Sequence, residues 1–264
     1  MDRSFLSQPA VIAASRQFVC IRLTTYEDEA EAKFSKTVFS PGGSGEPQNT
    51  TFALLAPDGK TKLTRAGRGT RGIFSDAADM AEQMTTVAAK YPVDPKVNEV
   101  VPPLPVTLTA KLGVDVAAAD GLLLVAVLAK EDRARADLSA AVAKLAWGEA
   151  FLGRFTYCTA TATDDFPKLD GLKAADGVVL IAPDTFGMSG KVVAQLPADV
   201  TPEAISKALT AALASHAKTA KSQRDHRNQG IEIGAYWVPK LPVTDKQEEN
   251  ARAGAKRAID AKKK

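Results

Sequence analysis

The chain has 264 residues, of which 45% are hydrophobic and 25% are charged, with a formal net charge of +3. These values are ordinary for a globular protein of two domains, and so small a charge does not require a nucleic-acid or membrane partner. Two cysteines (Cys20 and Cys158) and two histidines (His216 and His226) are too few and too scattered for a local zinc or redox motif. We therefore expect no metal and no cofactor.

The chain as given shows no export signal and no membrane span. Its first residues lack a basic region followed by an apolar one, and the longest apolar run, Gly121–Ala129, is about half as long as a membrane helix. The expected location is cytoplasmic if the chain begins at Met1, and periplasmic or secreted if a leader precedes it. The lysine-rich C-terminus, ending in Lys262-Lys263-Lys264, is expected to be a solvated tail.

The first half of the sequence predicts alternating helices and strands. A short helical segment is followed by an apolar strand, a charged amphipathic helix and a glycine- and proline-rich loop. A hairpin that turns at Asp58-Gly59 comes next, and Ser75 would cap a helix with Met80, Met84 and Val87 on its core stripe. The predicted elements are Arg3–Arg16, Phe18–Thr25, Glu27–Val38, Ser40–Asn49, Thr50–Gly59 with Lys60–Arg65, and Ser75–Lys90.

The second half repeats this alternation. After a proline-rich connection and an alternating segment that would add a strand, Gly121–Ala129 is typical of a strand buried on both faces. Thr244-x-x-Gln247 resembles a capping box at the start of a polar last helix. The predicted elements are Tyr91–Leu104, Val106–Ala119, Gly121–Ala129, Asp132–Leu152, Phe155–Thr163, Val178–Ile181, Lys191–Gln195 and Pro202–Lys218.

An internal repeat connects the two halves. Ala-Pro-Asp closes an apolar run twice, at Ala56-Pro57-Asp58 and at Ala182-Pro183-Asp184. Both halves have the order strand, helix, strand, hairpin, helix, which requires a mixed sheet. We predict an α/β fold of two tandem units with mixed central sheets flanked by helices, plus a basic helical tail. The expected boundaries are 1–104, 105–240 and 241–264.

This pattern resembles the thioredoxin-like fold of bacterial proteins. The phrases FVCIRLTTYED and TTFALLAPDGK…LTRAGRG are similar to a strand and hairpin of that family, over roughly residues 1–90 and, with fewer matching phrases, 120–215. The resemblance implies two thioredoxin-like units, the first incomplete at its N-terminus. Family members carry Trp-Cys-x-x-Cys after the first strand and a cis-proline before the hairpin. In the second unit of this chain, the position of the Cys-x-x-Cys motif is occupied by KEDRARAD. The segments at the cis-proline position, Gln48–Thr51 and Lys173–Gly177, contain no proline.

Without a dithiol, thiol–disulfide exchange has neither a nucleophile nor a resolving thiol. We therefore expect a non-catalytic, redox-inactive binding or scaffold protein with a protein partner. One alternative is an oxidoreductase whose Cys-x-x-Cys lies upstream of Met1. The other is an anion- or nucleic-acid-binding protein.

Two basic segments are candidate binding sites. Arg65, Arg68 and Arg71 alternate with glycines just before a predicted helix N-terminus, a combination suited to phosphate or carboxylate binding. The alternative is a glycine-rich connection whose arginines are solvated. A second set recurs every three residues and would form one basic helical face for an acidic partner or nucleic acid, or a solvated face. Its members are Lys218, Lys221, Arg224 and Arg227.

Two further features have simpler explanations beside the functional ones. Trp237 would anchor a partner or pack on its own domain. The acidic clusters Glu27-Asp28-Glu29 and Asp164-Asp165 would be paired carboxylates or, more simply, favourable charge at helix N-termini.

Overall fold

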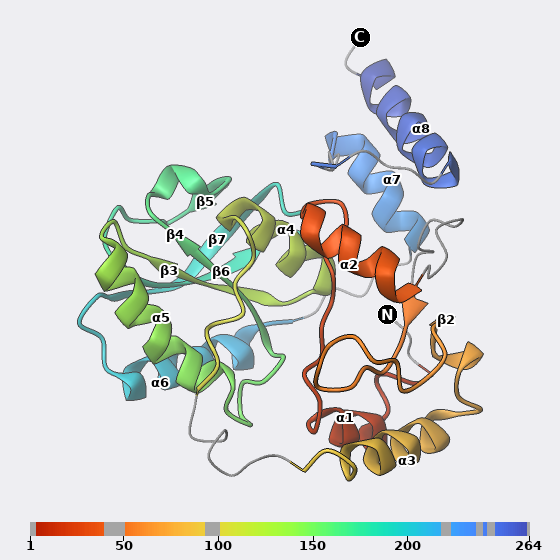
Figure 1. Cartoon of the computed structure of the whole chain (residues 1–264). Helices are drawn as coiled ribbons and strands as arrows, with labels where there is room; N and C mark the ends of the chain where they lie inside the picture. The colour runs from red at the N-terminus through yellow and green to blue at the C-terminus, as the bar shows by residue number, and fades with distance from the viewer. Residues whose placement is uncertain are drawn as a thin grey trace. The chain divides into compact units, whose positions relative to one another are not determined.

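The structure is a computed structural model that describes residues 4–39, 51–92, 101–217, 223–235, 240–241 and 246–262 (Figure 1). It divides into two compact units, one made of Met1–Pro95 with Tyr236–Lys264 and the other of Lys96–Ala235. The sequence predicted boundaries at 104 and 240, with the last residues as a separate tail. In this division the C-terminal segment clusters with the first unit.

The second unit contains a mixed five-stranded sheet with the order β4-β3-β6-β7-β5. The central strand β3 pairs in parallel with β4 and antiparallel with β6, while β6 and β7 form an antiparallel hairpin and β5 runs parallel to β7. The mixed sheet predicted for this part of the chain is confirmed. The strands are β3 (Leu123–Leu128), β4 (Phe155–Ala160), β5 (Lys168–Asp170), β6 (Gly177–Pro183) and β7 (Ser189–Pro197).

Helices cover both faces of this sheet (Figure 1). On one face α5 (Asp132–Ala146) and α6 (Pro202–Ser215) pack against a cluster that includes Val125 and Leu180. On the other face α4 (Ala110–Asp120) packs against a cluster that includes Leu124 and Ile181. Because both sides of β3 are covered, all six of its residues are buried, as its uninterrupted apolar sequence predicts.

The strand predicted within Val106–Ala119 is wrong, because most of this segment is helix α4. The side chain of Thr109 accepts a hydrogen bond from Leu112 N at 3.1 Å and so caps the helix. Beyond this cap, Val114 and Ala117 follow helical spacing and are fully buried. Only Val106 keeps strand character, in an isolated parallel bridge to Tyr157.

The first unit is built mainly from helices. Its core holds Phe5, Val11, Leu54, Phe74, Met80 and Met84, where α1 and α3 pack together. Pro9 begins α1 instead of interrupting it, because the first helical position needs no amide hydrogen. The elements are α1 (Pro9–Ser15), α2 (Glu29–Phe39), β1 (Thr51–Phe52), β2 (Gly67–Arg68), η1 (Thr70–Gly72), α3 (Ala77–Ala88) and α8 (Lys246–Lys262).

The strand predicted at Phe18–Thr25 does not form. No strand of the described residues pairs with it, and Val19 and Ile21 are 82% and 69% exposed. At its end, the backbone amide and hydroxyl of Thr24 donate to the Glu31 carboxylate of α2. A high β-propensity does not by itself make a strand, because its hydrogen bonds must come from a partner.

The hairpin at Asp58-Gly59 is present but shorter than predicted. Residues 51–65 form strand β1 and one antiparallel bridge, Leu55 to Lys62, in place of two full strands. The loop predicted at Ser40–Asn49 lies outside the described residues.

The helix cap predicted at Ser75 is one residue off. Asp76 is the N-cap of α3, and its carboxylate accepts from the amides of Ala78 and Asp79 at 2.9 Å each. Ser75 instead donates from its hydroxyl and its amide to Asp79 Oδ2. Met80 and Met84 are buried, as their spacing predicts.

In the described parts of the chain, none of the helices is both long and apolar enough to cross a bilayer.

Candidate functional site

The carboxyl edge of β3 and β4 is where an α/β sheet of this kind places a site. The chain leaves β3 through Ala129 and Lys130 and enters α5 two residues later. Lys130 N donates to Asp176 Oδ1 at 3.3 Å, so the residue before β6 contacts the start of this connection. Arg135 reaches back from α5 and donates to Ala129 O at 2.9 Å and to the Asp132 carboxylate. Arg135, Asp132 and Asp176 are thus each bonded to another group of this edge.

Asp165 closes the same edge after β4. Its Oδ2 accepts from Thr161 N at 2.7 Å, from the Thr161 hydroxyl at 3.0 Å and from Ala162 N at 3.1 Å. These backbone hydrogen bonds, with a smaller contribution from Arg135, lower the pKa of Asp165 below its usual range. Asp165 therefore holds its own turn as a carboxylate, and no α-helix begins at the Asp164-Asp165 pair, which is followed by β5.

The two thiols have little thiolate character. Cys158 lies on β4 with no exposed surface, and burial, with a contribution from the Asp165 charge, raises its pKa to about 12. Cys20 lies on an exposed stretch of the first unit, but its Sγ contacts Ser15 O at 3.8 Å and partial burial of the sulfur raises its pKa. Since the thiolate is the reactive form, both environments disfavour nucleophilic chemistry.

The predicted anion site around RAGRGTRG is only partly assembled. Arg65 donates to Gly72 O within its own loop, and Arg71 is exposed on η1. Arg68 lies on β2, and its side chain is outside the description. The amides at the start of α3 already bind the carboxylates of Asp76 and Asp79. An incoming anion would therefore meet the loop arginines without the helix N-terminus.

The predicted basic face is described only in part. Arg224 and Arg227 are exposed on α7 (Gln223–Ile233), whereas Lys218, Lys221 and Trp237 lie outside the described residues. The helix docks on its own unit through His226, whose ring centroid is 4.7 Å from that of Phe186. Gly230 lies on the same contact, because a Cβ there would be 3.1 Å from the Phe186 ring.

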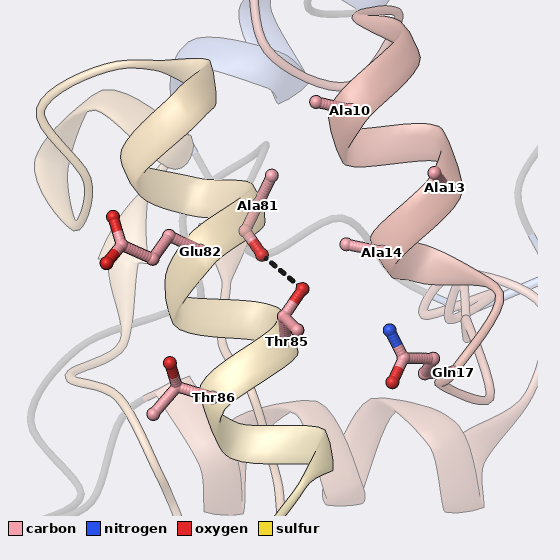
Figure 2. Close-up of a pocket in the computed structure, with 8 residues that line it drawn as sticks. All are labelled: Ala10, Ala13, Ala14, Gln17, Ala81, Glu82, Thr85 and Thr86. Atoms are coloured by element: carbon pink, nitrogen blue, oxygen red, sulfur yellow. Dashed lines mark hydrogen bonds between the residues drawn. The ribbon is translucent and has the colours of Figure 1, made fainter.

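A groove between α1 and α3 was not predicted from the sequence. Figure 2 shows the small side chains of Ala10, Ala14 and Ala81 facing the space between the two helices, which has a volume of about 440 Å³. Gln17 and Thr86 lie at one end, and the Thr85 hydroxyl is bonded within α3 to Ala81 O at 2.9 Å. Alanines at helical spacing were the available signal, but they become a groove only once the two helices are known to pack together.

Metal binding has no support in the described ranges, where no group of three His, Cys, Asp or Glu side chains is arranged to hold an ion.

Comparison with known proteins identifies no relative. No family model matches the chain, and neither a curated protein nor a solved structure matches it significantly. A functional assignment therefore depends on the chain's own residues.

Proposed function

We propose that this chain is a binding or scaffold protein of thioredoxin-like architecture that works without a redox-active dithiol. The order β4-β3-β6-β7 supports this architecture for the second unit. So do the parallel connection through α5 and the antiparallel β6–β7 hairpin that precedes α6. These are the connections that the predicted strand, helix, strand, hairpin, helix order requires.

The two Ala-Pro-Asp turns support a common origin of the two units. Asp58 Oδ1 accepts from Lys60 N and Thr61 N, each at 2.8 Å. Asp184 Oδ1 accepts from Phe186 N at 2.7 Å and from Met188 N at 3.2 Å. In both turns the carboxylate after the proline accepts hydrogen bonds from two backbone amides and so stabilises the hairpin. This shared local structure is expected of a repeat.

The state of the two thiols is the observation that carries the non-redox assignment. At the end of β3, where the resemblance would place a dithiol, the chain has Lys130, Glu131 and Asp132. Cys158 is fully buried and Cys20 belongs to the other unit, each with a raised pKa. A disulfide-exchange site needs two neighbouring thiols, one of them a thiolate near neutral pH. Binding through a fixed surface needs neither.

An insulin-reduction assay with the full chain and dithiothreitol tests this proposal. We expect the chain to precipitate insulin no faster than dithiothreitol alone, because neither thiol is poised to attack a disulfide. Turnover above that background would contradict the proposal.

Thiol titration with an aromatic disulfide reagent is the matching control. Cys158 should stay unreactive in the native chain near neutral pH, because it has no exposed surface and burial disfavours its thiolate. In denaturant both thiols should react at the rate of an ordinary cysteine. Rapid reaction of native Cys158 near neutral pH would show that the burial argument is wrong.

A second candidate function, binding of an acidic partner or nucleic acid, is favoured by the exposed arginines of α7. Arg224 and Arg227 are three residues apart and share a helical face. The contact between this helix and Phe186 is made by other residues, His226 and Gly230.

Replacing both arginines with glutamate should weaken nucleic-acid binding at low salt and reduce its salt dependence by about two phosphate contacts. Fluorescence anisotropy with a labelled single-stranded DNA across a salt series measures this. The matched control is Lys144→Glu with Lys207→Glu, which changes two exposed charges on α5 and α6. Equal weakening by both pairs would exclude a specific role for α7.

A further inference from the structure

Asp58 and Gly59 form the dipeptide that is chemically the most prone to isomerise, and they lie in an exposed turn. In this reaction the Gly59 amide nitrogen attacks Asp58 Cγ. The carboxyl group loses one oxygen as water, the amide loses its proton, and a cyclic succinimide forms. Water then opens the ring at either carbonyl and yields aspartate or isoaspartate. No oxidant or other reagent is needed.

Both reacting groups are engaged in this turn. The nucleophile, Gly59 N, donates its hydrogen to Ala56 O at 2.9 Å. The electrophile is held on the other side: Asp58 Oδ1 accepts from Lys60 N and Thr61 N at 2.8 Å, and Oδ2 accepts from the Thr61 hydroxyl at 2.6 Å. These bonds direct the carboxylate forward along the chain toward Thr61, while Gly59 N is bonded in the opposite direction along the chain.

The protonation state of the Asp58 carboxyl group also slows succinimide formation. The hydrogen bond from the Thr61 side chain, followed by those from the two amides, lowers the pKa of Asp58 to about 2. Succinimide formation is faster from the neutral carboxyl group, because water is a better leaving group than an oxide. A carboxylate stabilised in its ionised form is therefore less reactive.

We propose that the Thr61 hydroxyl protects the Asp58-Gly59 peptide from isoaspartate formation in the native chain. This inference is independent of the proposed binding function. Modification would insert a methylene group into the main chain between Leu55 and Lys62, the pair that forms the bridge of this hairpin. It would also move the free carboxylate onto Cα, one methylene closer to the main chain and out of reach of its partners in the turn, so the hairpin would lose its register.

Thr61→Val tests the proposal, because valine keeps the shape and the backbone amide and removes only the hydroxyl. The full-length native chain and the variant are incubated at mildly acidic and neutral pH, and isoaspartate at residue 58 is measured by peptide mapping with mass spectrometry. We expect the variant to isomerise roughly threefold to tenfold faster, the change expected from losing one solvent-exposed hydrogen bond. An unchanged rate would overturn the proposal.

Three controls distinguish this effect from general loosening of the fold. Thr61→Ser retains a hydroxyl and should isomerise at the wild-type rate. Ser189→Ala removes the matching hydroxyl bond to Asp184 Oδ2, 2.7 Å long in the other turn, and should leave residue 58 unchanged. The wild-type chain in denaturant should isomerise at least tenfold faster than the native chain, since all the turn contacts are lost. A native rate equal to the denatured rate would also overturn the proposal.

Discussion

Replacing Gly177 with alanine is expected to remove a large part of the free energy that stabilises the second unit. Gly177 is the first residue of β6 and has a φ of +152°, a conformation that L-residues rarely adopt. A Cβ atom at this position would lie 1.8 Å from Leu196 O and 2.9 Å from Leu196 C. Both atoms belong to the backbone of β7, which pairs with β6 from Gly177 and Pro197 onward. Relief of the clash would therefore require the two strands to separate.

The expected loss in the free energy of unfolding is roughly 3–5 kcal/mol, since backbone strain and an unavoidable clash act together. This is a large part of the roughly 5–15 kcal/mol that stabilises a typical domain. Urea unfolding followed by circular dichroism measures the change.

Gly153→Ala is the matched control for Gly177→Ala. Gly153 lies in the same unit with a φ of +69°, but no atom lies within 4 Å of its hypothetical Cβ. This variant should lose only about 1 kcal/mol, because it has the conformational strain without the clash. If both variants lost the same stability, the contact with β7 would not be the cause.

Truncation of Leu180 to alanine should have the second largest effect. Leu180 is fully buried in the middle of β6, in the cluster between the sheet and helices α5 and α6. Removing its side chain leaves a cavity that helices on one side and the β-sheet on the other can fill only partly. The expected loss is about 2–5 kcal/mol, measured by the same urea titration.

Val193→Ala provides the comparison for Leu180→Ala. Val193 lies on the neighbouring strand β7, close to the register shift at Leu180/Ile181, and is 41% exposed. Its truncation removes less buried surface and should lose less than about 1 kcal/mol. If the two variants lost the same stability, the burial of Leu180 in this cluster would not be the cause of its effect.

The candidate sites were predictable only in their local parts. The sequence singled out the arginines near α3 and the basic residues Arg224 and Arg227 of α7, because charge spacing is visible along the chain. It did not identify the contact between Lys130 and Asp176, which are 46 residues apart, nor the carbonyl that binds Arg65. Whether neighbouring charges are free or already engaged depends on partners that the fold supplies.

The sequence by itself determined the second unit most fully. The apolar runs at β3 and β6, the helical stripes of α5 and α6 and the strand-like sequences of β4 and β7 are local patterns, and these six predicted elements are present. A strand buried on both faces needs apolar residues throughout, and an amphipathic helix needs them at helical spacing, so both structures can be recognised from a short window.

Only the tertiary structure decided the rest. Phe18–Thr25 has the composition of a strand but no described partner, and Thr109 turned an alternating segment into helix α4 by capping it. Gly177 was not distinguishable from other glycines until β7 was placed against it. The physical reason is common to all three cases: strand pairing, close backbone contacts and competing caps are settled by partners that the local sequence does not specify.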